Sequence, residues 1–319
     1  MVPKIKDQKI APRSRSRSCS LYLGPAGWSY SDWDSVVYPA RRGRGFRPLQ
    51  FLARYFNAVE INTSFYRIPS PSLCEKWAEE VEPFDDFLFS AKLWQDFTHV
   101  REALDTRSLN QWHGAMEPLR RAGRLGAVLV QFPWSFKRTR QNAKYLDALT
   151  LALAPDPLAI EMRHDSWNSE EFLAWLRERG HAFCNIDQPR LGHCLPPTEH
   201  VTAPVAYIRL HGRNAENWFR EEADVAERYK YLYSKEEIGD WVERFRRLIE
   251  KAEKVFVITN NHTEGRAVVN ALQIKAMLTD SKVEAPPGLV RRYPELADFA
   301  QTLPPDEPNP PDGEQLSLF

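Results

Sequence analysis

The sequence predicts a (β/α)₈ barrel, and three observations lead to that prediction. Eight short apolar or alternating segments have the character of strands, helical patterns lie between most of them, and the alternation occupies about 250 residues. The polar residues of these segments gather toward their C-terminal ends, where barrels of this class place their chemistry. A doubly wound open sheet also alternates strands and helices, but no G-x-G-x-x-G follows the first expected strand.

The expected strands alternate apolar with polar residues. In residues 58–62, Val59 and Ile61 alternate with Glu60 and Asn62, which gives the strand one apolar and one polar face. In a closed barrel the apolar face packs against helices, so the polar face is expected to point toward the barrel axis. The expected strands are residues 21–27, 58–62, 87–93, 126–132, 158–163, 182–187, 205–211 and 255–261. The polar residues expected to point inward from the later strands are Ser90, Lys92, Gln131, Glu161, Arg163, Asn185, Asp187, Tyr207, Arg209 and His211.

Helix starts between these strands are marked by capping residues. Ser70 precedes a proline, so an N-cap side chain is followed by proline at the first helical position. Asn168, with Glu171 three residues later, is the expected N-cap of the helix after the fifth strand. Ser234 and Glu237 form a capping-box pattern before an apolar stripe of helical spacing. Local signals therefore agree with the alternation predicted from the strand count.

The two ends of the chain differ in composition from its middle. Residues 1–20 contain an Arg-Ser repeat without hydrophobic period and are expected to be a disordered basic tail. Residues 21–300 are expected to form the barrel, and residues 301–319 a proline-rich linker that ends in a docking peptide. Residues 212–233, rich in aromatic and charged side chains, are expected to be either a lid over the barrel mouth or a surface insertion.

Composition narrows the class of protein. The 319 residues include 43 basic and 43 acidic side chains, and this formal net charge of zero argues against a globally basic nucleic-acid coat. No apolar run approaches the roughly 18–20 residues of a membrane span, and the N-terminus lacks the apolar segment of a signal peptide. The four cysteines show no C-x-x-C spacing, so free thiols are expected. A cytoplasmic protein without a membrane partner is the resulting expectation.

Seven motifs occur in order along the barrel region. They are Gly27-Trp28-Ser29-Tyr30 with Trp33, Val59-Glu60-Ile61-Asn62 with Phe65-Tyr66-Arg67 and Pro69, Thr98-His99, Gln131-Phe132-Pro133, Glu161-x-Arg163 with Ser166-Trp167, Arg209-x-His211-Gly212, and Asn260-Asn261 with Gly265. With these motifs, the chain from residue 21 onward resembles domain-of-unknown-function family 72, the YecE-like proteins. The resemblance implies a TIM-type barrel and brings no established activity with it.

The chain ends in Gln315-Leu316-Ser317-Leu318-Phe319. This peptide resembles the consensus by which bacterial replication and repair proteins dock on the DNA sliding clamp. The resemblance implies that Leu316, Leu318 and Phe319 fill a hydrophobic cleft while Gln315 enters a polar pocket. It leads us to expect the sliding clamp as partner, a nucleoid-associated location and a role in DNA replication or repair. The alternative is a frayed terminus that does not dock.

The side chains at the strand ends favour an enzyme that acts on an anionic substrate, such as a nucleotide or a DNA end, by hydrolysis or rearrangement. Arginine binds phosphate through parallel hydrogen bonds, and aromatic rings stack on bases. Glu60 or Glu161 would be the general base and a histidine the general acid. The predicted catalytic residues are Glu60, His99, Glu161, Asp187 and His211. The predicted substrate-binding residues are Trp28, Tyr30, Asn62, Tyr66, Arg67, Lys92, Gln131, Arg163, Trp167, Arg209, Asn260 and Asn261.

Two other enzymatic interpretations use the same carboxylates. A divalent metal ion would be bound by Glu60, Glu161, Asp187 and His211, although arginines two residues from the proposed ligands would compete with it. A glycosidase would use Glu60 and Glu161 as its carboxylate pair, which requires roughly 5–10 Å between the carboxyl groups. The number of arginines argues against a neutral sugar as substrate.

Two interpretations without catalysis also stay open. The charges can simply neutralise one another inside the barrel, because buried charges need partners. The expected pairs are Glu161–Arg163, Glu60–Arg209 and Asp187–Lys92. Alternatively, the barrel is an adaptor that binds nucleic acid or a metabolite while the C-terminal peptide recruits it to the replication machinery. Strongly perturbed pKa values at the barrel mouth would favour the enzyme, and a fully ion-paired mouth would favour the adaptor.

Overall fold

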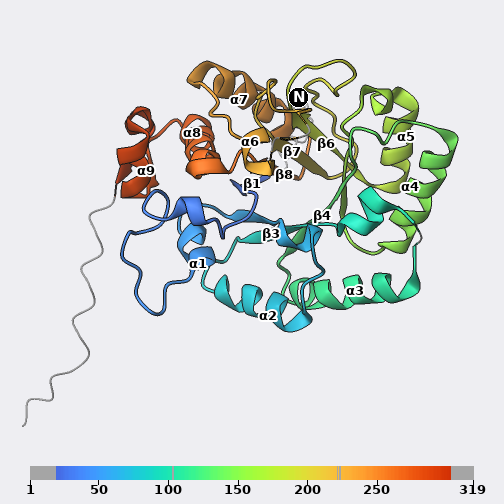
Figure 1. Ribbon diagram of the computed structural model, residues 1–319, viewed down its shortest axis with the longest axis horizontal. Helices are drawn as coiled ribbons and strands as arrows, with labels where there is room; N and C mark the ends of the chain where they lie inside the picture. Colours follow the sequence, from blue (N-terminus) through green and yellow to red (C-terminus); the bar gives the residue numbers. More distant parts are fainter. Residues whose placement is uncertain (1–18, 103, 221, 223, 303–319) are drawn as a thin grey trace, which may run out of the picture.

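The computed structural model describes residues 19–102, 104–220, 222 and 224–302, which form a nearly closed barrel of eight parallel strands (Figure 1). The strands are β1 (Ser20–Pro25), β2 (Ala58–Ile61), β3 (Leu88–Lys92), β4 (Leu125–Gln131), β5 (Leu158–Glu161), β6 (Ala182–Asp187), β7 (Val205–Leu210) and β8 (Lys254–Thr259). They pair in the order β1-β8-β7-β6-β5-β4-β3-β2. The predicted (β/α)₈ fold class is confirmed, and each strand lies at its expected place in the chain.

The barrel closes where β1 approaches β2. Ala26 forms a parallel bridge with Glu60, and the Gly27 N–H donates a 2.9 Å hydrogen bond to the Glu60 carbonyl. The approach is so close that a Cβ added to Gly24 would lie 1.8 Å from the Ala58 carbonyl oxygen. Only glycine allows two backbones to come together at this distance. Closure of the barrel therefore requires glycine, which has no side chain, at position 24.

Most of the helices cover the outside of the barrel (Figure 1). The helices are α1 (Pro48–Ala53), α2 (Pro71–Glu80), α3 (Thr106–Arg121), α4 (Arg140–Ala152), α5 (Glu170–Arg179), α6 (Val225–Arg228), α7 (Lys235–Ile249), α8 (Arg266–Thr279) and α9 (Pro287–Arg292). Of these, α6 lies at the barrel mouth. Short helical turns are η1 (Ser31–Trp33), η2 (Thr63–Phe65), η3 (Asp96–Val100), η4 (Asp165–Trp167), η5 (Thr263–Gly265) and η6 (Pro294–Asp298). A small parallel pair, β9 (Val283–Ala285) and β10 (Ala300–Thr302), packs against α8. Residues 188–204, between β6 and β7, contain no helix.

The helix N-termini follow the capping signals with one correction. Ser70 and Ser234 cap α2 and α7 as predicted, and the α7 cap is a complete capping box. The predicted cap of α5, Asn168, is wrong, because the Ser169 hydroxyl accepts the hydrogen bond from the Phe172 N–H. Asn168 instead ends the preceding turn η4, and its side-chain oxygen lies 3.0 Å from His200 Nε2. None of the described helices is both long and apolar enough to cross a bilayer.

Aromatic rings close the N-terminal end of the barrel. Phe256 stacks on Tyr22 and on Tyr207, with ring centroids 4.9 and 5.6 Å apart. Gly126 leaves room for this cluster, since a Cβ there would lie 2.4 Å from Phe256 Cζ. The apolar floor excludes water from below. Polar side chains in the upper half of the barrel are therefore accessible only from the C-terminal ends of the strands.

Candidate functional site

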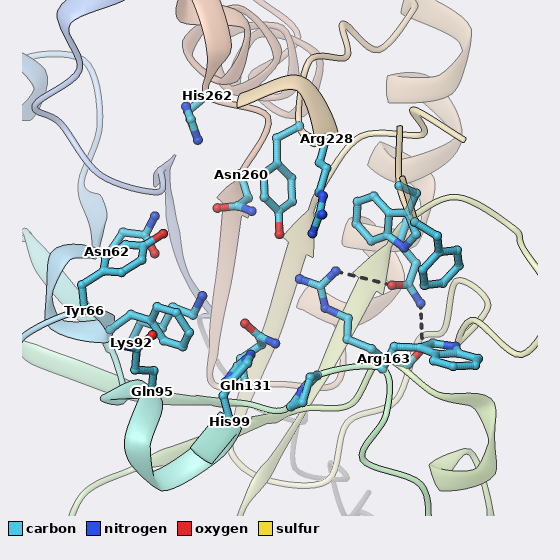
Figure 2. A pocket seen from close by; sticks show the side chains of 17 residues that line it. Asn62, Tyr66, Lys92, Gln95, His99, Gln131, Arg163, Arg228, Asn260 and His262 are labelled. Atoms are coloured by element: carbon cyan, nitrogen blue, oxygen red, sulfur yellow. Dashed lines mark hydrogen bonds between the residues drawn. The ribbon is translucent and has the colours of Figure 1, made fainter. Parts of the chain in front are cut away.

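A cavity of about 400 Å³ opens at the C-terminal ends of the strands (Figure 2). Seven of the predicted site residues line it, from β3, β4 and the segments that follow β2, β3, β5 and β8: Asn62, Tyr66, Lys92, His99, Gln131, Arg163 and Asn260. Successive residues of a strand point to opposite faces, so every second residue near a strand end faces the barrel axis. The structure thus brings together residues that are as much as 198 positions apart between Asn62 and Asn260.

The rest of the lining was missing from the predicted site. The segment after β7 contributes Trp218, Phe219, Arg228 and Tyr229, so the stretch expected to be a lid or an insertion does cover part of the mouth. The aromatic composition of this segment was the sequence feature that could have indicated its place at the cavity, although none of its residues was predicted to bind a substrate. The other lining residues are Phe65, Gln95, Pro133, Trp134, Gln188 and His262.

The described charged side chains that line the cavity are all basic. Lys92, Arg163 and Arg228 contribute cationic groups, and none of the described residues that line the cavity is an aspartate or glutamate. Some N–H groups there are weakly bonded or unused: the two Nη atoms of Arg163 contact Gln188 and His211 at 3.5 Å and its side chain bonds to Tyr229, whereas Arg228 Nε is buried without a partner. Unpaired buried donors are costly, so this lining favours an anionic ligand that would accept from them.

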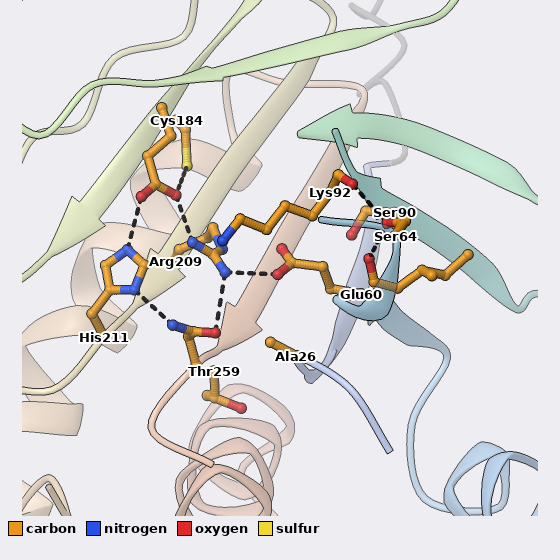
Figure 3. A network of polar contacts seen from close by, with 12 residues as sticks. Ala26, Glu60, Ser64, Ser90, Lys92, Cys184, Arg209, His211 and Thr259 are labelled. Atoms are coloured by element: carbon orange, nitrogen blue, oxygen red, sulfur yellow. Dashed lines mark hydrogen bonds and ion pairs between the residues drawn. The ribbon is translucent and has the colours of Figure 1, made fainter. Parts of the chain in front are cut away.

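A buried ion network, consisting of Glu60, Glu161, Arg163, Arg209 and His211, adjoins the cavity through Arg163. Figure 3 labels Glu60, Arg209 and His211 of this network. The Arg209 guanidinium is its centre: Nη2 donates to Glu60 Oε1 at 2.6 Å, and Nη1 donates to Glu161 Oε2 at 2.7 Å. Arg209 is 1% exposed, and both glutamates are fully buried. Two of the predicted ion pairs, Glu60–Arg209 and Glu161–Arg163, are confirmed by this geometry.

Glu161 is the most heavily engaged carboxylate of the network. Its Oε1 accepts a 2.5 Å hydrogen bond from Arg163 Nε and lies 3.2 Å from His211 Nε2. Burial alone would raise the pKa of Glu161, but Arg163 and Arg209 outweigh burial and hold that pKa well below its usual range. Burial and the charge of Arg163 push the pKa of His211 far down, so His211 is neutral. Its Nδ1 lies 3.1 Å from Asn260 Nδ2, which can only donate.

The two glutamates lie outside the cavity lining. The oxygens of Glu60 and Glu161 are bonded to Arg209, Arg163 and the Tyr207 hydroxyl. For either carboxylate to act as the predicted base or nucleophile, these bonds would have to rearrange. The Arg209 guanidinium lies between the two glutamates and is bonded to both. It therefore occupies the space that a glycosidase would need for its substrate. The role of the two glutamates is to hold Arg163 and Arg209 in place.

Lys92 is the ionisable amine of the cavity. It ends β3, and its Nζ lies 3.8 Å from the centroid of the Phe65 ring. Burial and the nearby charge of Arg209 lower the pKa of Lys92 to about 7, although Glu60 and Glu161 partly oppose the shift. Lys92 therefore exchanges a proton close to neutral pH. The expected pair Asp187–Lys92 is wrong, because Asp187 is bound elsewhere.

His99 lies on η3, just after β3, beside the same aromatic ring. Its ring centroid is 4.9 Å from that of Phe65, and its Nδ1 lies 2.9 Å from Thr98 Oγ1. Burial and the neighbouring charge of Lys92 lower the pKa of His99 to about 4. His99 is thus a neutral imidazole at physiological pH, able to accept a proton but not to act as a stored acid.

The predicted inward orientation of the polar residues of β6 is wrong. Cys184 is the β6 residue that faces the ion network, with its Sγ 3.8 Å from Glu161 Oε2. Asn185 accepts hydrogen bonds from the Thr198 hydroxyl and the His200 N–H, and Asp187 accepts one from Arg213 Nε at 2.8 Å. The reason is the helix-free segment 188–204 and the loop after β7, whose polar groups need partners on the outer face of this strand.

Five other predicted substrate-binding residues also lie outside the cavity lining. Trp28 packs edge-on against Trp77, and Tyr30 donates to the Ala26 carbonyl. The indole N–H of Trp167 donates to the Phe136 carbonyl inside a stack of rings. The Asn261 side chain holds the Tyr231 carbonyl and Asn270, and Arg67 is exposed. Packing and hydrogen bonding around the mouth thus account for the positions of Trp28, Tyr30, Trp167 and Asn261, but not for Arg67.

The donor set does not fit the predicted divalent metal. Glu60, Glu161, Asp187 and His211 do not converge, since Asp187 lies on the outer face of β6 and Arg209 sits between the two glutamates. In the part of the chain that the structure describes, potential ligands do gather at His164 and Asp165, after β5, and His193, after β6. Hydrogen bonds account for that group: His193 Nδ1 contacts Asp165 Oδ2, and the Ser166 N–H donates to His164 Nδ1.

Comparison with known proteins gives matches along most of the chain. Residues 22–292 match the family described as "Protein of unknown function DUF72". The chain is 30% identical over 272 residues to the UPF0759 protein YunF of Bacillus subtilis (strain 168), a match that covers 81% of this chain and 94% of YunF. It is 31% identical over 147 residues to the UPF0759 protein YecE of Escherichia coli (strain K12), covering 45% of this chain and 48% of YecE.

Solved structures agree with these matches. A crystal structure of a DUF72 family protein from Thermotoga maritima MSB8 has a TM-score of 0.72 at 38% identity, covering 82% of this chain and 99% of that one. A DUF72 family protein from Enterococcus faecalis V583 has a TM-score of 0.71 at 28% identity, covering 81% and 95%. The match of residues 22–292 and the 30% identity to YunF over most of both chains therefore show that this chain belongs to the DUF72 family of TIM-type barrels.

Proposed function

We propose that the cavity binds a small ligand with a phosphate-like anionic group, and that the protein is an enzyme whose proton transfers use Lys92 and His99. One observation carries the proposal: three cationic side chains face the cavity, Arg228 Nε among them is buried without a partner, and no aspartate or glutamate stands among the described lining residues. The perturbed pKa values of Lys92 and His99 in the mouth favour an enzyme over a passive adaptor.

The aromatic walls indicate what else the ligand carries. The Arg163 guanidinium lies over the Trp218 ring at 5.4 Å, and Tyr66, which lines the cavity, is 57% exposed. Rings of this kind stack on flat groups such as a nucleobase, at about 1–3 kcal/mol for each base. A nucleotide or a nucleic-acid end therefore remains the substrate class that we favour, and hydrolysis or rearrangement at the phosphate remains the reaction class.

Sulfate binding tests the anion site. Sulfate keeps its charge between about pH 6 and about pH 8, whereas Lys92, with a pKa of about 7, loses its charge over that range. We expect isothermal titration calorimetry to show an affinity for sulfate that falls about tenfold as the pH rises, because a charged hydrogen bond is lost.

The matched variant is Lys92→Met, for which we expect weak sulfate binding with little dependence on pH. Wild-type protein that fails to bind sulfate at the low end of this range would remove the proposed function. Equal pH dependence in wild type and Lys92→Met would show that another group titrates.

We further propose that the C-terminal peptide tethers the barrel to the bacterial sliding clamp. Residues Gln315, Leu316, Leu318 and Phe319 lie outside the described residues, so the support for this proposal is the sequence of the peptide and the proline-rich segment before it. Deleting residues 315–319 should abolish binding to purified clamp in surface plasmon resonance. A matched deletion of residues 1–12 should leave binding intact, and unchanged binding after the C-terminal deletion would remove the tether.

A further inference from the structure

The amine of Lys92 differs from those of Lys230 and Lys275 in its surroundings. Lys230 forms an ion pair with Glu264 at 3.2 Å, and Lys275 donates to the Tyr55 carbonyl at 2.6 Å. For Lys92, no described carboxylate oxygen lies within 4.0 Å of Nζ, and its contact is with the Phe65 ring. An ammonium that is buried without a carboxylate partner is expensive to keep charged.

Burial and the groups around Lys92 lower its pKa to about 7, so that a large share of the amine is neutral at neutral pH. Arg209 and Arg163 repel a proton on Nζ, while the opposing charges of Glu60 and Glu161 are already bonded to those guanidiniums. His99 faces the same region as a neutral ring. Desolvated lysines beside other cations are the lysines that act as nucleophiles. An arginine at position 92 would bind an anion equally well, so anion binding alone does not explain a lysine with a lowered pKa at this position.

We propose that Lys92 is a catalytic nucleophile that forms a Schiff base with an aldehyde or ketone carrying a phosphate-like group. This inference rests on the proposed anion site. Arg163, whose Nη contacts with Gln188 and His211 are long at 3.5 Å, and Arg228, whose Nε has no partner, line the same cavity, so they would bind the anionic end of the ligand while its carbonyl carbon meets Nζ. The ligand class is therefore a phosphorylated carbonyl compound.

The chemistry balances without a further reagent. The Nζ lone pair forms a bond to the carbonyl carbon, and the carbonyl oxygen takes a proton to give a carbinolamine. The hydroxyl group then leaves as water while nitrogen loses a proton, which gives the imine. One water is released, and nothing is oxidised or reduced. His99, neutral and close to the Phe65 ring, is placed to relay these protons.

Reductive trapping tests the inference. The full chain is incubated with pyridoxal 5′-phosphate and sodium borohydride at neutral pH, and labelled lysines are identified by peptide mass spectrometry. We expect Lys92 to be labelled at least about tenfold faster than exposed Lys144 or than Lys275, a second lysine whose pKa burial lowers. Sulfate should slow labelling at Lys92 only. The rate at Lys92 should rise as the pH passes about 7.

A conservative variant separates the covalent role from anion binding. Lys92→Arg keeps the positive charge, so it should still bind sulfate but should yield no label at position 92. Equal labelling of Lys92, Lys144 and Lys275 in protein that binds sulfate would overturn the Schiff-base inference and leave the anion site standing. Labelling of Lys92 that sulfate does not slow would contradict the placement of the anion beside the amine. Failure of both sulfate binding and selective labelling would remove the proposed function as well.

Discussion

Replacing Glu161 with glutamine is expected to lower the free energy of unfolding by about 3–5 kcal/mol, the usual cost of removing one partner from a buried ion pair. Glu161 accepts from Arg163 Nε at 2.5 Å and from Arg209 Nη1 at 2.7 Å, and it is fully buried. Without its charge, two buried guanidiniums share the single carboxylate of Glu60. Chemical denaturation followed by circular dichroism measures the loss.

The matched control for this prediction is Glu171→Gln. Glu171 lies 3.8 Å from Arg138 on the surface and is 72% exposed, so the change should cost less than about 1 kcal/mol. The pKa of Glu161 is depressed in the folded protein, so its contribution is complete above the ordinary value of 4.5 and is lost as the pH falls. The advantage of wild type over Glu161→Gln should therefore shrink in acid. Equal stability of wild type and Glu161→Gln would contradict the ion network.

Gly24→Ala is expected to lower the free energy of unfolding by about 3 kcal/mol or more. The new Cβ would lie 1.8 Å from the Ala58 carbonyl oxygen and 2.8 Å from its carbon, so β1 and β2 would have to separate where the barrel closes. Overpacking against backbone is more costly than the usual 1–3 kcal/mol of a crowded core, because a backbone cannot change rotamer. Thermal unfolding by calorimetry gives the measurement.

The control is a second glycine-to-alanine change in open space. Gly114 lies inside α3, is exposed, and an added Cβ would meet no heavy atom within 4 Å. Gly114→Ala should raise stability by about 0.5–1 kcal/mol, since alanine favours the helix. A small loss for Gly24→Ala, comparable with the effect at Gly114, would show that β1 and β2 are less tightly joined than described.

The alternation of Val59 and Ile61 with Glu60 shows why the fold was predictable from sequence. Apolar residues at period two and capped helical stripes are local signals; the strand signal occurs eight times and helical stripes separate most of the strands, so errors at single residues do not alter the architecture. The signal failed at Asn168 and Ser169, where two adjacent residues can each cap a helix. It failed again at Asp187, because no local pattern says whether the next segment brings a partner such as Arg213 to the outer face.

The site was harder to predict than the fold for a physical reason. Sequence identifies ionisable residues at the strand ends, and Lys92 and Arg163 do line the cavity. It does not show that the Arg209 guanidinium saturates both glutamates, which removes them from the accessible chemistry. Arg228 was missed because it follows a loop without a strand-end position. Which charges remain free is a property of the whole network.

Arg163 lines the barrel mouth with its Nε bonded to Glu161 and its Nη atoms in longer contacts, and we propose that these Nη atoms bind the anion. The sulfate titration tests it most directly when wild type, Arg163→Met and Arg121→Met are compared, since Arg121 lies on α3 with a side chain 68% exposed and pairs with Glu75. The account predicts that Arg163→Met, once shown to be folded by circular dichroism, binds sulfate roughly 10- to 100-fold more weakly, while Arg121→Met binds like wild type. Equal affinities in all three proteins would contradict it.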